Sequence, residues 1–372
     1  MHRENNTNLS LLFRNSEPHS SNKPDSKKLG RQLSIAVLGV EPPTAQSVSR
    51  FTQLVHERPV RQPLNGKVLL FYHYCTIEQP QELLDWQVLL CGLLRLRGRI
   101  HVGKEGMNGT VGGSCEAIRL YKESVQTHCR WSVHFGTMPF KESSGGHHCF
   151  PNLYVRVCRE ICQMNLSPEL IHWKNGGRHL KAVEFHKLVE EMNTGIRNKP
   201  NVPTDTVLLD VRNLYESAVG QFDGAIRIPT RHFIDFPEVA DRLIERYDLR
   251  KKKKVLMYCT GGIRCERASA YLRSKGVTQC FQLLGGIHNY VEEMGEATFF
   301  RGKNFVFDRR LTTKRVGTQL PVSTCIFCDE YHDEYDKHFS CDTCSCLVLV
   351  CKSCRTQKMR TAVCSTCFAK EF

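Results

Sequence analysis

Apolar residues change their spacing several times along the first half of the chain. Residues 68–74 form an apolar-rich run of strand length, whereas residues 80–96 carry leucine and valine at the three- and four-residue spacing of an amphipathic helix. Shorter runs at 99–102 and 110–112 predict two strands around a glycine-containing turn. The pattern therefore predicts a strand, a helix and two further strands, in that order.

The segments that follow complete an α+β pattern. A second helix is predicted over residues 116–125 and a returning strand over residues 153–157. The order strand–helix–strand–strand–helix–strand predicts a ferredoxin-like or acylphosphatase-like domain over residues 64–162. The polar segment 141–148 is predicted as a loop. It contains two neighbouring histidines, and because no other ligand is suggested near them, we interpret them as loop residues and not as a metal site.

Strands and helices alternate in the next part of the chain, which is typical of a small parallel sheet. Compact apolar runs at 207–211 and 255–258 predict strands, and amphipathic segments lie between and around them. The pattern predicts an α/β domain over residues 180–302, joined to the first domain by a linker of residues 163–179. The predicted helices are 182–192, 238–247, 266–275 and 287–294, and a further short strand is predicted around residues 281–284.

Composition and charge predict a disordered leader, a cellular location and a class of partner. Residues 1–63 are rich in Ser, Asn, Pro and Arg without sustained periodicity, so we expect a disordered leader. The first residues are polar and no run of about 18 apolar residues occurs, so we expect a cytoplasmic location, without secretion and without a membrane partner. The 372 residues carry a formal net charge of +14. This charge favours an anionic partner such as RNA over the alternative of an ordinary basic surface.

One cysteine lies between a predicted strand and a predicted helix. The strand 255–258 ends at Cys259, and two glycines follow before the helix. Backbone N–H groups of such a loop and the positive end of the helix dipole stabilise a thiolate, the nucleophilic form of cysteine. Arg264 is predicted to orient either an anionic substrate or the loop itself. Cys259 and Arg264 are therefore the predicted catalytic residues. Cys265 is either a resolving thiol for Cys259 or a half-buried helix residue.

Three separate motifs resemble the rhodanese family in order and spacing. They are residues 208–216, residues 220–229 and the loop Cys-Thr-Gly-Gly-Ile-Arg at residues 259–264. The resemblance implies that Cys259 carries sulfur as a persulfide, received from a small-molecule or protein sulfur donor, and that Asp210 is structural and hydrogen-bonds loop backbone. Rhodanese-like phosphatases have five residues between the cysteine and the arginine, whereas this loop has four, and Tyr258 stands where a histidine would precede the cysteine. These differences indicate against phosphate-ester hydrolysis.

Further motifs extend the resemblance to one group within that family. The segments 103–111, 138–142 and 321–328 resemble those of bacterial rhodanese-domain tRNA uridine hydroxylases. Those enzymes add oxygen to the wobble uridine of certain tRNAs and need the cysteine at the position of Cys259. The resemblance implies tRNA as a partner, gripped in part by the first domain. The basic residues of that domain that would contact phosphates are Arg95, Arg97, Arg99 and Lys104.

The end of the chain is rich in cysteine, with nine of the 19 cysteines between Cys325 and Cys367. Eight of them form four C-x2-C pairs, and two such pairs make a tetrahedral zinc site. We therefore predict two structural zinc ions in a tail of residues 321–372, which is too short for a large apolar core. Sequential and interleaved pairing are both open, an iron–sulfur cluster is the alternative metal group, and Cys346, His332 and His338 are spare ligands. The predicted ligands are Cys325, Cys328, Cys341, Cys344, Cys351, Cys354, Cys364 and Cys367.

The sequence leads to three hypotheses about function. The first is a sulfurtransferase that forms a persulfide on Cys259, and the second is a tRNA wobble-uridine hydroxylase. The third is a non-catalytic rhodanese scaffold that joins RNA or a protein partner through the basic and zinc-bearing units. The presence of the cysteine and of both loop glycines favours an enzyme over an inert module.

Overall fold

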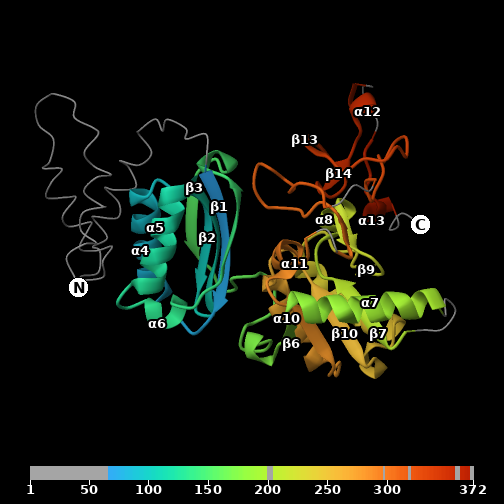
Figure 1. Cartoon of the computed structure of the whole chain (residues 1–372), viewed down its shortest axis with the longest axis horizontal. Coiled ribbons are helices and arrows are strands. Elements are labelled where there is room, and N and C mark those ends of the chain that lie inside the picture. Colours follow the sequence, from blue (N-terminus) through green and yellow to red (C-terminus); the bar gives the residue numbers. More distant parts are fainter. Residues whose placement is uncertain (1–65, 199–203, 296–297, 317–319, 357–360, 369–372) are drawn as a thin grey trace, which may run out of the picture. The chain divides into compact units, whose positions relative to one another are not determined.

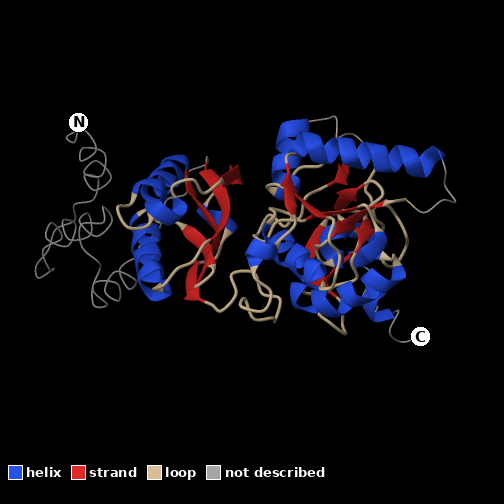
Figure 2. Cartoon of the chain, turned by 90° about the horizontal axis from the view of Figure 1, so that it is seen from below, coloured by secondary structure: helices blue, strands red, loops and turns tan. Residues whose placement is uncertain are grey.

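The computed structural model describes residues 66–198, 204–295, 298–316, 320–356 and 361–368 (Figure 1). These residues form two compact units, which divide after Val157 except that residues 70–74 are grouped with the second unit. The predicted leader, residues 1–63, lies outside the described residues. Within the described ranges, no helix is long and apolar enough to cross a membrane. Each unit has its own sheet and its own helices, as the colouring by secondary structure shows (Figure 2).

The first unit is a five-stranded sheet with helices on one face (Figure 1). Its strands have the order β4-β1-β3-β2-β5, and the strand–helix–strand–strand–helix–strand order of the first six long elements confirms the predicted acylphosphatase-like fold. The elements are β1 (Gly66–Tyr74), α4 (Pro80–Leu93), β2 (Arg97–Gly103), β3 (Gly106–Ser114), α5 (Cys115–Thr127), α6 (Ser132–Phe135), β4 (Phe140–Gly145) and β5 (Leu153–Val157).

Two predictions for this unit were wrong in detail. The segment 141–148 was predicted as a loop, but Phe140–Gly145 forms the edge strand β4 beside β1, and the two histidines lie in a short 3-10 turn after it. The strand predicted to close the motif, Leu153–Val157, is an added fifth strand parallel to β2. The strand β4 was not predicted because it is mostly polar. Its one buried residue is Lys141, so the strand has no apolar alternation in the sequence.

The helices of the first unit bury apolar stripes against the sheet. In α4 the buried residues include Leu83, Trp86 and Leu90, and a proline occupies its first turn, where the missing N–H costs no helical hydrogen bond. The helix α5 begins after Ser114, whose hydroxyl accepts the amide of Ala117 at 3.1 Å. Alternate residues of the strands face these helices, so the other strand residues point to the opposite face of the sheet.

The second unit is built on a five-stranded parallel sheet of order β6-β11-β10-β7-β9. Its strands are β6 (Arg178–Leu180), β7 (Thr206–Asp210), β9 (Ile226–Arg227), β10 (Lys254–Tyr258) and β11 (Cys280–Leu283), and a small antiparallel pair is formed by β8 (Gly220–Phe222) and β12 (Phe300–Gly302). Its helices are α7 (Ala182–Asn198), α8 (Leu214–Ala218), α9 (Phe236–Arg246), α10 (Ile263–Ser274) and α11 (Gly286–Met294).

Helices cover both faces of this sheet and create two apolar cores. Leu209 and Met257 face one core with residues of α9 and α10, whereas Leu208 and Leu256 face the other core with residues of α7 and α11. Neighbouring residues of one strand thus belong to different cores, because strand side chains alternate between faces. This arrangement confirms the predicted α/β rhodanese fold.

The residues predicted as a linker, 163–179, pack against the second unit. Met164 and Ile171 belong to one of its cores. The guanidinium of Arg267, fully buried in α10, donates to the carbonyl of Leu166 at 2.7 Å and to the carboxylate of Glu160 at 3.2 Å. The segment therefore forms part of the wall of the second unit.

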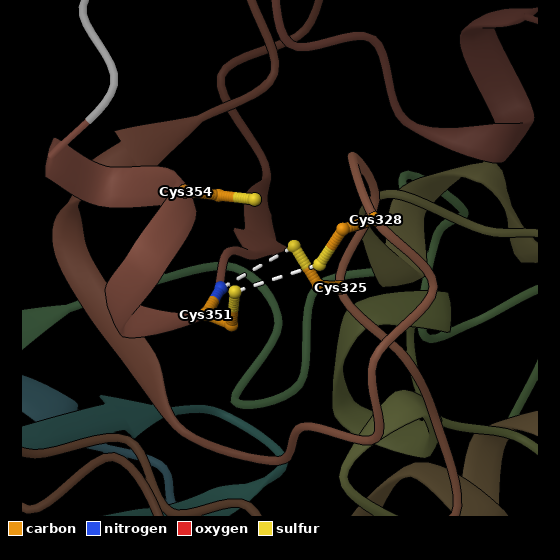
Figure 3. A group of neighbouring side chains, drawn as sticks. All are labelled: Cys325, Cys328, Cys351 and Cys354. Atoms are coloured by element: carbon orange, nitrogen blue, oxygen red, sulfur yellow. Dashed lines mark hydrogen bonds between the residues drawn. The ribbon is translucent and has the colours of Figure 1, made fainter.

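The cysteine-rich tail is part of the second unit and contains little regular structure. A hairpin of β13 (Tyr335–Ser340) and β14 (Leu347–Leu349) is followed by α12 (Lys352–Thr356) and α13 (Ser365–Phe368). The core of the tail consists largely of cysteine, and one of its two cysteine groups is shown in Figure 3. Leu349 also packs with Val219 and Phe305, so the tail is joined to the rhodanese domain through an apolar contact.

Candidate functional site

The loop that carries Cys259 joins the end of β10 to the start of α10. Gly262 has φ 104°, a conformation that side chains rarely adopt, and the helix begins at the next residue. The first amides of α11 hold the loop from the other side. Those of Ile287 and His288 donate to the carbonyls of Cys259 and Thr260 at 3.0 and 3.2 Å. The conformation of the loop is therefore fixed by two helix N-termini.

Gly286, the first residue of α11, lies against the loop backbone. A Cβ atom at this position would lie 2.5 Å from the carbonyl oxygen of Cys259 and 2.8 Å from the amide nitrogens of Gly261 and Gly262. The residue also has φ +67°. Only glycine permits this approach without displacing the loop.

The sulfur of Cys259 lies in an environment that favours the thiolate. The residue is buried, and its sulfur accepts the amide of Gly262 at 3.1 Å. Burial by itself would raise the pKa of this thiol. A hydrogen bond from Cys265, the positive charge of Arg264 and the amides of Arg264 and Gly262 outweigh that effect and lower the pKa to about 6. Such a thiol is mostly ionised at neutral pH and is a ready nucleophile.

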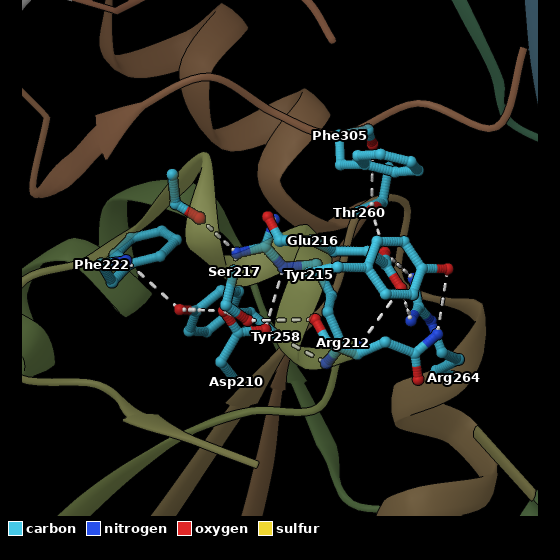
Figure 4. Close-up of polar contacts among 12 residues, drawn as sticks. Asp210, Arg212, Tyr215, Glu216, Ser217, Phe222, Tyr258, Thr260, Arg264 and Phe305 are labelled. Carbon is cyan, nitrogen blue, oxygen red and sulfur yellow. Dashed lines mark hydrogen bonds and ion pairs between the residues drawn. The ribbon is translucent and has the colours of Figure 1, made fainter. Parts of the chain in front are cut away.

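Arg264 is held by a carboxylate and does not point freely into solvent. Its two terminal nitrogens donate to the two carboxylate oxygens of Glu216 at 2.7 and 2.6 Å, and both side chains are buried (Figure 4). Glu216 lies in α8, where its carboxylate also accepts the amide of Asn213 and so caps that helix. Of the two predicted roles for Arg264, this geometry fits the one that orients the loop.

A second buried network lies at the end of β7 around Asp210 (Figure 4). The carboxylate of Asp210 accepts two bonds from the guanidinium of Arg212, at 2.9 and 2.6 Å, and a third from its amide at 3.1 Å. The hydroxyls of Ser217 and Tyr258 donate to the same carboxylate at 2.9 and 2.8 Å. All these groups are buried, so the charges are compensated within the network. Asp210 is thus structural, as predicted, but its carboxylate bonds Arg212, Ser217 and Tyr258 in place of the predicted backbone of the cysteine loop.

Cys265 lies in the first turn of α10, directly after the cysteine loop, and is fully buried, not half-buried. Burial, and then its hydrogen bond to Cys259, raise the pKa of the Cys265 thiol well above the ordinary value. The two thiols thus have opposite tendencies, with Cys259 as the thiolate and Cys265 as the proton donor to it. Cys265 thereby stabilises the thiolate form of Cys259.

Residues after the sheet cover the ion pair of Arg264 and Glu216. The ring of Phe307 lies with its centroid 5.5 Å from the Arg264 guanidinium carbon, and the carbonyl of Phe305 accepts the hydroxyl of Thr260 at 3.5 Å. From the tail, the hydroxyl of Tyr335 donates to the carbonyl of Tyr215 at 2.5 Å. The tail therefore reaches the element that carries Glu216.

Several of these residues have no role that the sequence predicts. Glu216 was part of a motif without a function, although its position three residues after Asn213 is the signature of a helix capping box. Phe305, Phe307 and Tyr335 are aromatic residues of irregular segments, and nothing in the sequence relates them to a loop so far away along the chain.

The eight paired cysteines form two groups of four. The first cysteine group is Cys325, Cys328, Cys351 and Cys354 (Figure 3), and the second cysteine group is Cys341, Cys344, Cys364 and Cys367. In each group the sulfur atoms all lie within 4.8 Å of one another. Of the two pairings that the spacing left open, the structure has the interleaved one, in which the first C-x2-C pair joins the third and the second joins the fourth.

The donor set of each group fits a tetrahedral metal ion. Four thiolates at the zinc–sulfur distance would stand about 3.8 Å apart. The Sγ atoms of Cys328 and Cys351 are 3.6 Å apart, and those of Cys344 and Cys364 are 3.7 Å apart. Backbone amides support the sulfurs, since those of Cys351 and Cys364 donate to the sulfurs of Cys325 and Cys341 at 3.4 and 3.3 Å.

The three spare ligands lie outside both groups. Cys346 is a neighbour of the second group, with its sulfur 3.3 Å from that of Cys344. His332 is engaged with the carbonyl of Glu334 at 2.8 Å, and His338 is exposed. Four cysteines without a further donor complete each site, which leaves no open position for water or substrate.

Three known domain families match the chain in succession. Residues 66–161 match the UPF0176 acylphosphatase like domain, residues 188–293 match the rhodanese-like domain, and residues 301–368 match the rhodanase C-terminal domain. The last match begins with the segment that covers the ion pair of Arg264 and ends in the second cysteine group.

Whole proteins also match this chain over most of its length. A tRNA uridine(34) hydroxylase of Corynebacterium aurimucosum is 36% identical over 298 residues, which cover 78% of this chain and 91% of that protein. The chain belongs to this rhodanese-domain family. A second tRNA uridine(34) hydroxylase of the family, from Cytophaga hutchinsonii, is 37% identical over 304 residues, or 81% of this chain and 89% of that protein. The resemblance predicted from the motifs is thereby confirmed.

A plant member of the rhodanese-domain family is longer. Rhodanese-like domain-containing protein 6 of Arabidopsis thaliana is 37% identical over 317 residues, which cover 81% of this chain and 52% of that protein. The chain therefore spans about half the length of the plant relative and about nine tenths of the two bacterial ones.

Proposed function

We propose that the chain is an RNA-modifying enzyme of the tRNA uridine hydroxylase type, with Cys259 as its nucleophile. The observation that carries the proposal is the buried sulfur of Cys259, which accepts the amide of Gly262 at 3.1 Å and has its pKa lowered to about 6. The first hypothesis from the sequence is sulfur transfer, and the second is tRNA hydroxylation. The names of the two bacterial relatives support the opposite order.

The thiolate suits the chemistry of a uracil ring. Carbon 6 of uracil is the electron-poor end of a conjugated carbonyl system, so a thiolate adds to it and leaves carbon 5 nucleophilic. Carbon 5 then attacks an oxidant of the hydroperoxide class. A carbon–oxygen bond forms while the oxygen–oxygen bond breaks, and the other oxygen of the hydroperoxide leaves and takes up a proton, as an alcohol or, from hydrogen peroxide, as water. Loss of the proton from carbon 5 expels the thiolate and restores the ring, so the uridine is oxidised by two electrons and Cys259 is regenerated.

In this proposal Arg264 is a positioning residue. Its guanidinium is occupied by Glu216, yet its positive charge lowers the pKa of Cys259. It therefore acts on the reaction through the sulfur and the loop, and the substrate binds elsewhere. Cys265 acts in a similar way through its hydrogen bond to the thiolate.

Sulfur transfer is the second candidate function. A loop that stabilises a thiolate by amides and by the positive end of a helix also stabilises the terminal sulfur of a persulfide. This alternative needs a small-molecule or protein sulfur donor, which would load Cys259 with one sulfur atom.

We also propose that each cysteine group holds one zinc ion in a structural role. All-cysteine sites with sulfur spacings close to those of a tetrahedral complex favour zinc, and the ions would join chain segments that share little apolar core. Eight cysteines would serve as ligands, and Cys346 would serve as none.

Two measurements test the proposed activity. Nucleosides from the tRNA of cells lacking the protein should lose 5-hydroxyuridine and its derivatives at the wobble position, and wild-type protein should restore them whereas the Cys259→Ser variant should not. In parallel, the intact mass of purified protein is measured after thiosulfate treatment. Unchanged tRNA together with the gain of one sulfur atom on Cys259 would reject the hydroxylase in favour of the sulfurtransferase.

A further inference from the structure

The sheet of the first unit carries a row of polar and basic side chains on the face opposite its helices. Ile100 and Val102 of β2 are fully buried, and α4 packs against this strand. The residues that alternate with them, Arg97, Arg99 and His101, therefore point to the other face. The structure thus separates an apolar and a basic side of the same strand.

Strand register extends this row across three strands. Arg99 pairs with Thr110 of β3 on one side and with Tyr154 of β5 on the other. The next row of the same face contains Asn108, His101 and Arg156. We call the surface formed by these side chains the open sheet face. It consists of Arg97, Arg99, His101, Asn108, Thr110, Tyr154 and Arg156.

Among the residues that the structure describes, no carboxylate neutralises the arginines of the open sheet face. Arg97, Arg99 and Arg156 form no ion pair with a carboxylate anywhere in the described ranges of the chain. On the helical side of the same unit, by contrast, Arg119 of α5 pairs with Glu116 and Glu123. Arg99 and Arg156 lie diagonally across neighbouring strands of one face, so an anion bound between them would be attracted by both.

Tyr154 adds an aromatic surface to the open sheet face. Its side chain is 54% exposed, which is unusual for a large aromatic residue on a strand. The guanidinium carbon of Arg156 lies 5.9 Å from the centre of its ring. A flat sheet with an exposed ring beside arginines offers stacking to a base and charge to a phosphate at the same place.

We propose that the open sheet face binds a single-stranded segment of RNA, with a base stacked on Tyr154 and phosphates held by Arg99 and Arg156. A flat sheet does not enter the narrow major groove of duplex RNA, whereas unpaired bases can be splayed out on it. The neighbouring hydroxyl of Thr110 is suited to a 2′-hydroxyl group. The inference rests on the proposed function in that it names the part of the protein that holds the loop of a tRNA.

Binding of full-length protein to a fluorescent anticodon stem–loop RNA with uridine at the wobble position tests the inference. The Tyr154→Ala variant should weaken binding by about tenfold, as expected when one base stack is removed. The double variant Arg99→Ala/Arg156→Ala should weaken it further and lower the slope of log affinity against log salt by about 0.7 for each phosphate that the protein no longer neutralises. The matched control Arg119→Ala removes a positive charge from the helical side of the same unit and should bind as wild type does.

Thermal unfolding curves of all variants ensure that weaker binding does not reflect a protein that has failed to fold. Equal binding by wild type, Tyr154→Ala and the double arginine variant would overturn the inference. So would displacement of the RNA by polyglutamate with no effect of Tyr154→Ala, which would indicate a surface for an acidic protein. The Cys259→Ser variant should bind the RNA normally. Normal binding with no hydroxylation by wild type would therefore reject the proposed reaction and leave the RNA surface in place.

Discussion

Arg264 and Glu216 form a bidentate ion pair at 2.7 and 2.6 Å, although 48 positions separate them along the chain. The pair connects the first turn of α10, next to Cys259, with the capped helix α8. It places a buried positive charge beside the thiolate and at the same time balances that charge with a carboxylate. Both the geometry of the loop and the pKa of Cys259 therefore depend on this contact.

Removal of the carboxylate should destabilise the protein strongly. The Glu216→Gln variant leaves Arg264 buried without an anion, and removing one partner of a buried pair lowers the free energy of unfolding by about 3–5 kcal/mol. Urea unfolding measures the effect. The exposed pair of Arg242 and Glu238 in α9 supplies the control, since Glu238→Gln should change stability by less than about 1 kcal/mol. Equal effects of the two variants would contradict the role assigned to the buried pair.

The reactivity of Cys259 should have an unusually low pH midpoint. Its pKa is lowered to about 6, so the thiolate fraction rises through that pH and alkylation should reach half its maximal rate there. The rate is measured with a small haloacetamide by mass spectrometry of the peptide that contains Cys259. The Cys265→Ala variant removes one of the hydrogen bonds that lower this pKa, so its midpoint should move upward. A midpoint at the ordinary cysteine value in wild type would disprove the thiolate.

The lowered pKa of Cys259 should also make the stability of the folded protein depend on pH. The folded pKa of Cys259 lies below that of an ordinary cysteine, near ~8.5, so the thiolate stabilises the folded state fully above that value. This contribution is lost as pH falls through about 6. Denaturation midpoints of wild type and Cys259→Ser should therefore converge on acidification across that window. Parallel curves would show that Cys259 is not ionised in the folded protein.

Gly286 should tolerate no side chain. The Gly286→Ala variant brings Cβ to 2.5 Å from the carbonyl oxygen of Cys259, at φ +67°, and should lose more than about 2 kcal/mol of stability and shift the loop. Gly195 in α7 is the matched control because a Cβ there meets nothing within 4 Å. Gly195→Ala should stabilise the protein by about 0.5–1 kcal/mol. Differential scanning calorimetry distinguishes the two, and similar shifts in both would contradict the close approach.

Metal content should follow the two cysteine groups. Purified protein should contain two zinc ions per chain by elemental mass spectrometry, and the Cys351→Ser variant should lose the ion of the first group only. Cys346→Ser provides the control, because Cys346 lies outside both groups and its replacement should leave both ions bound. Iron with visible absorption in place of zinc would reject the zinc assignment. Equal loss in Cys346→Ser would show that the ligand set is different.

Local patterns in the sequence predict the candidate nucleophile and determine the domain types. A strand, a cysteine, two glycines and a helix predict the loop at Cys259 because each step depends on near neighbours in the chain. The four C-x2-C pairs predict metal ligands for the same reason. The edge strand β4 was not predicted because its residues do not alternate between apolar and polar. The strand Leu153–Val157 was predicted at the wrong place in the sheet because strand pairing depends on residues far away in the chain.

Only the tertiary structure decided which distant residues meet. The spacing of the cysteines allowed sequential and interleaved pairing, and the fold of the tail selects the interleaved one. The sequence allowed Arg264 to orient either a substrate or the loop. In the structure α8 lies beside α10, and Arg264 forms an ion pair with Glu216. The open sheet face likewise arises from the pairing of β2 with β3 and β5. These contacts form between residues that are far apart in the sequence and meet only when the domains pack. A local sequence pattern therefore does not predict them.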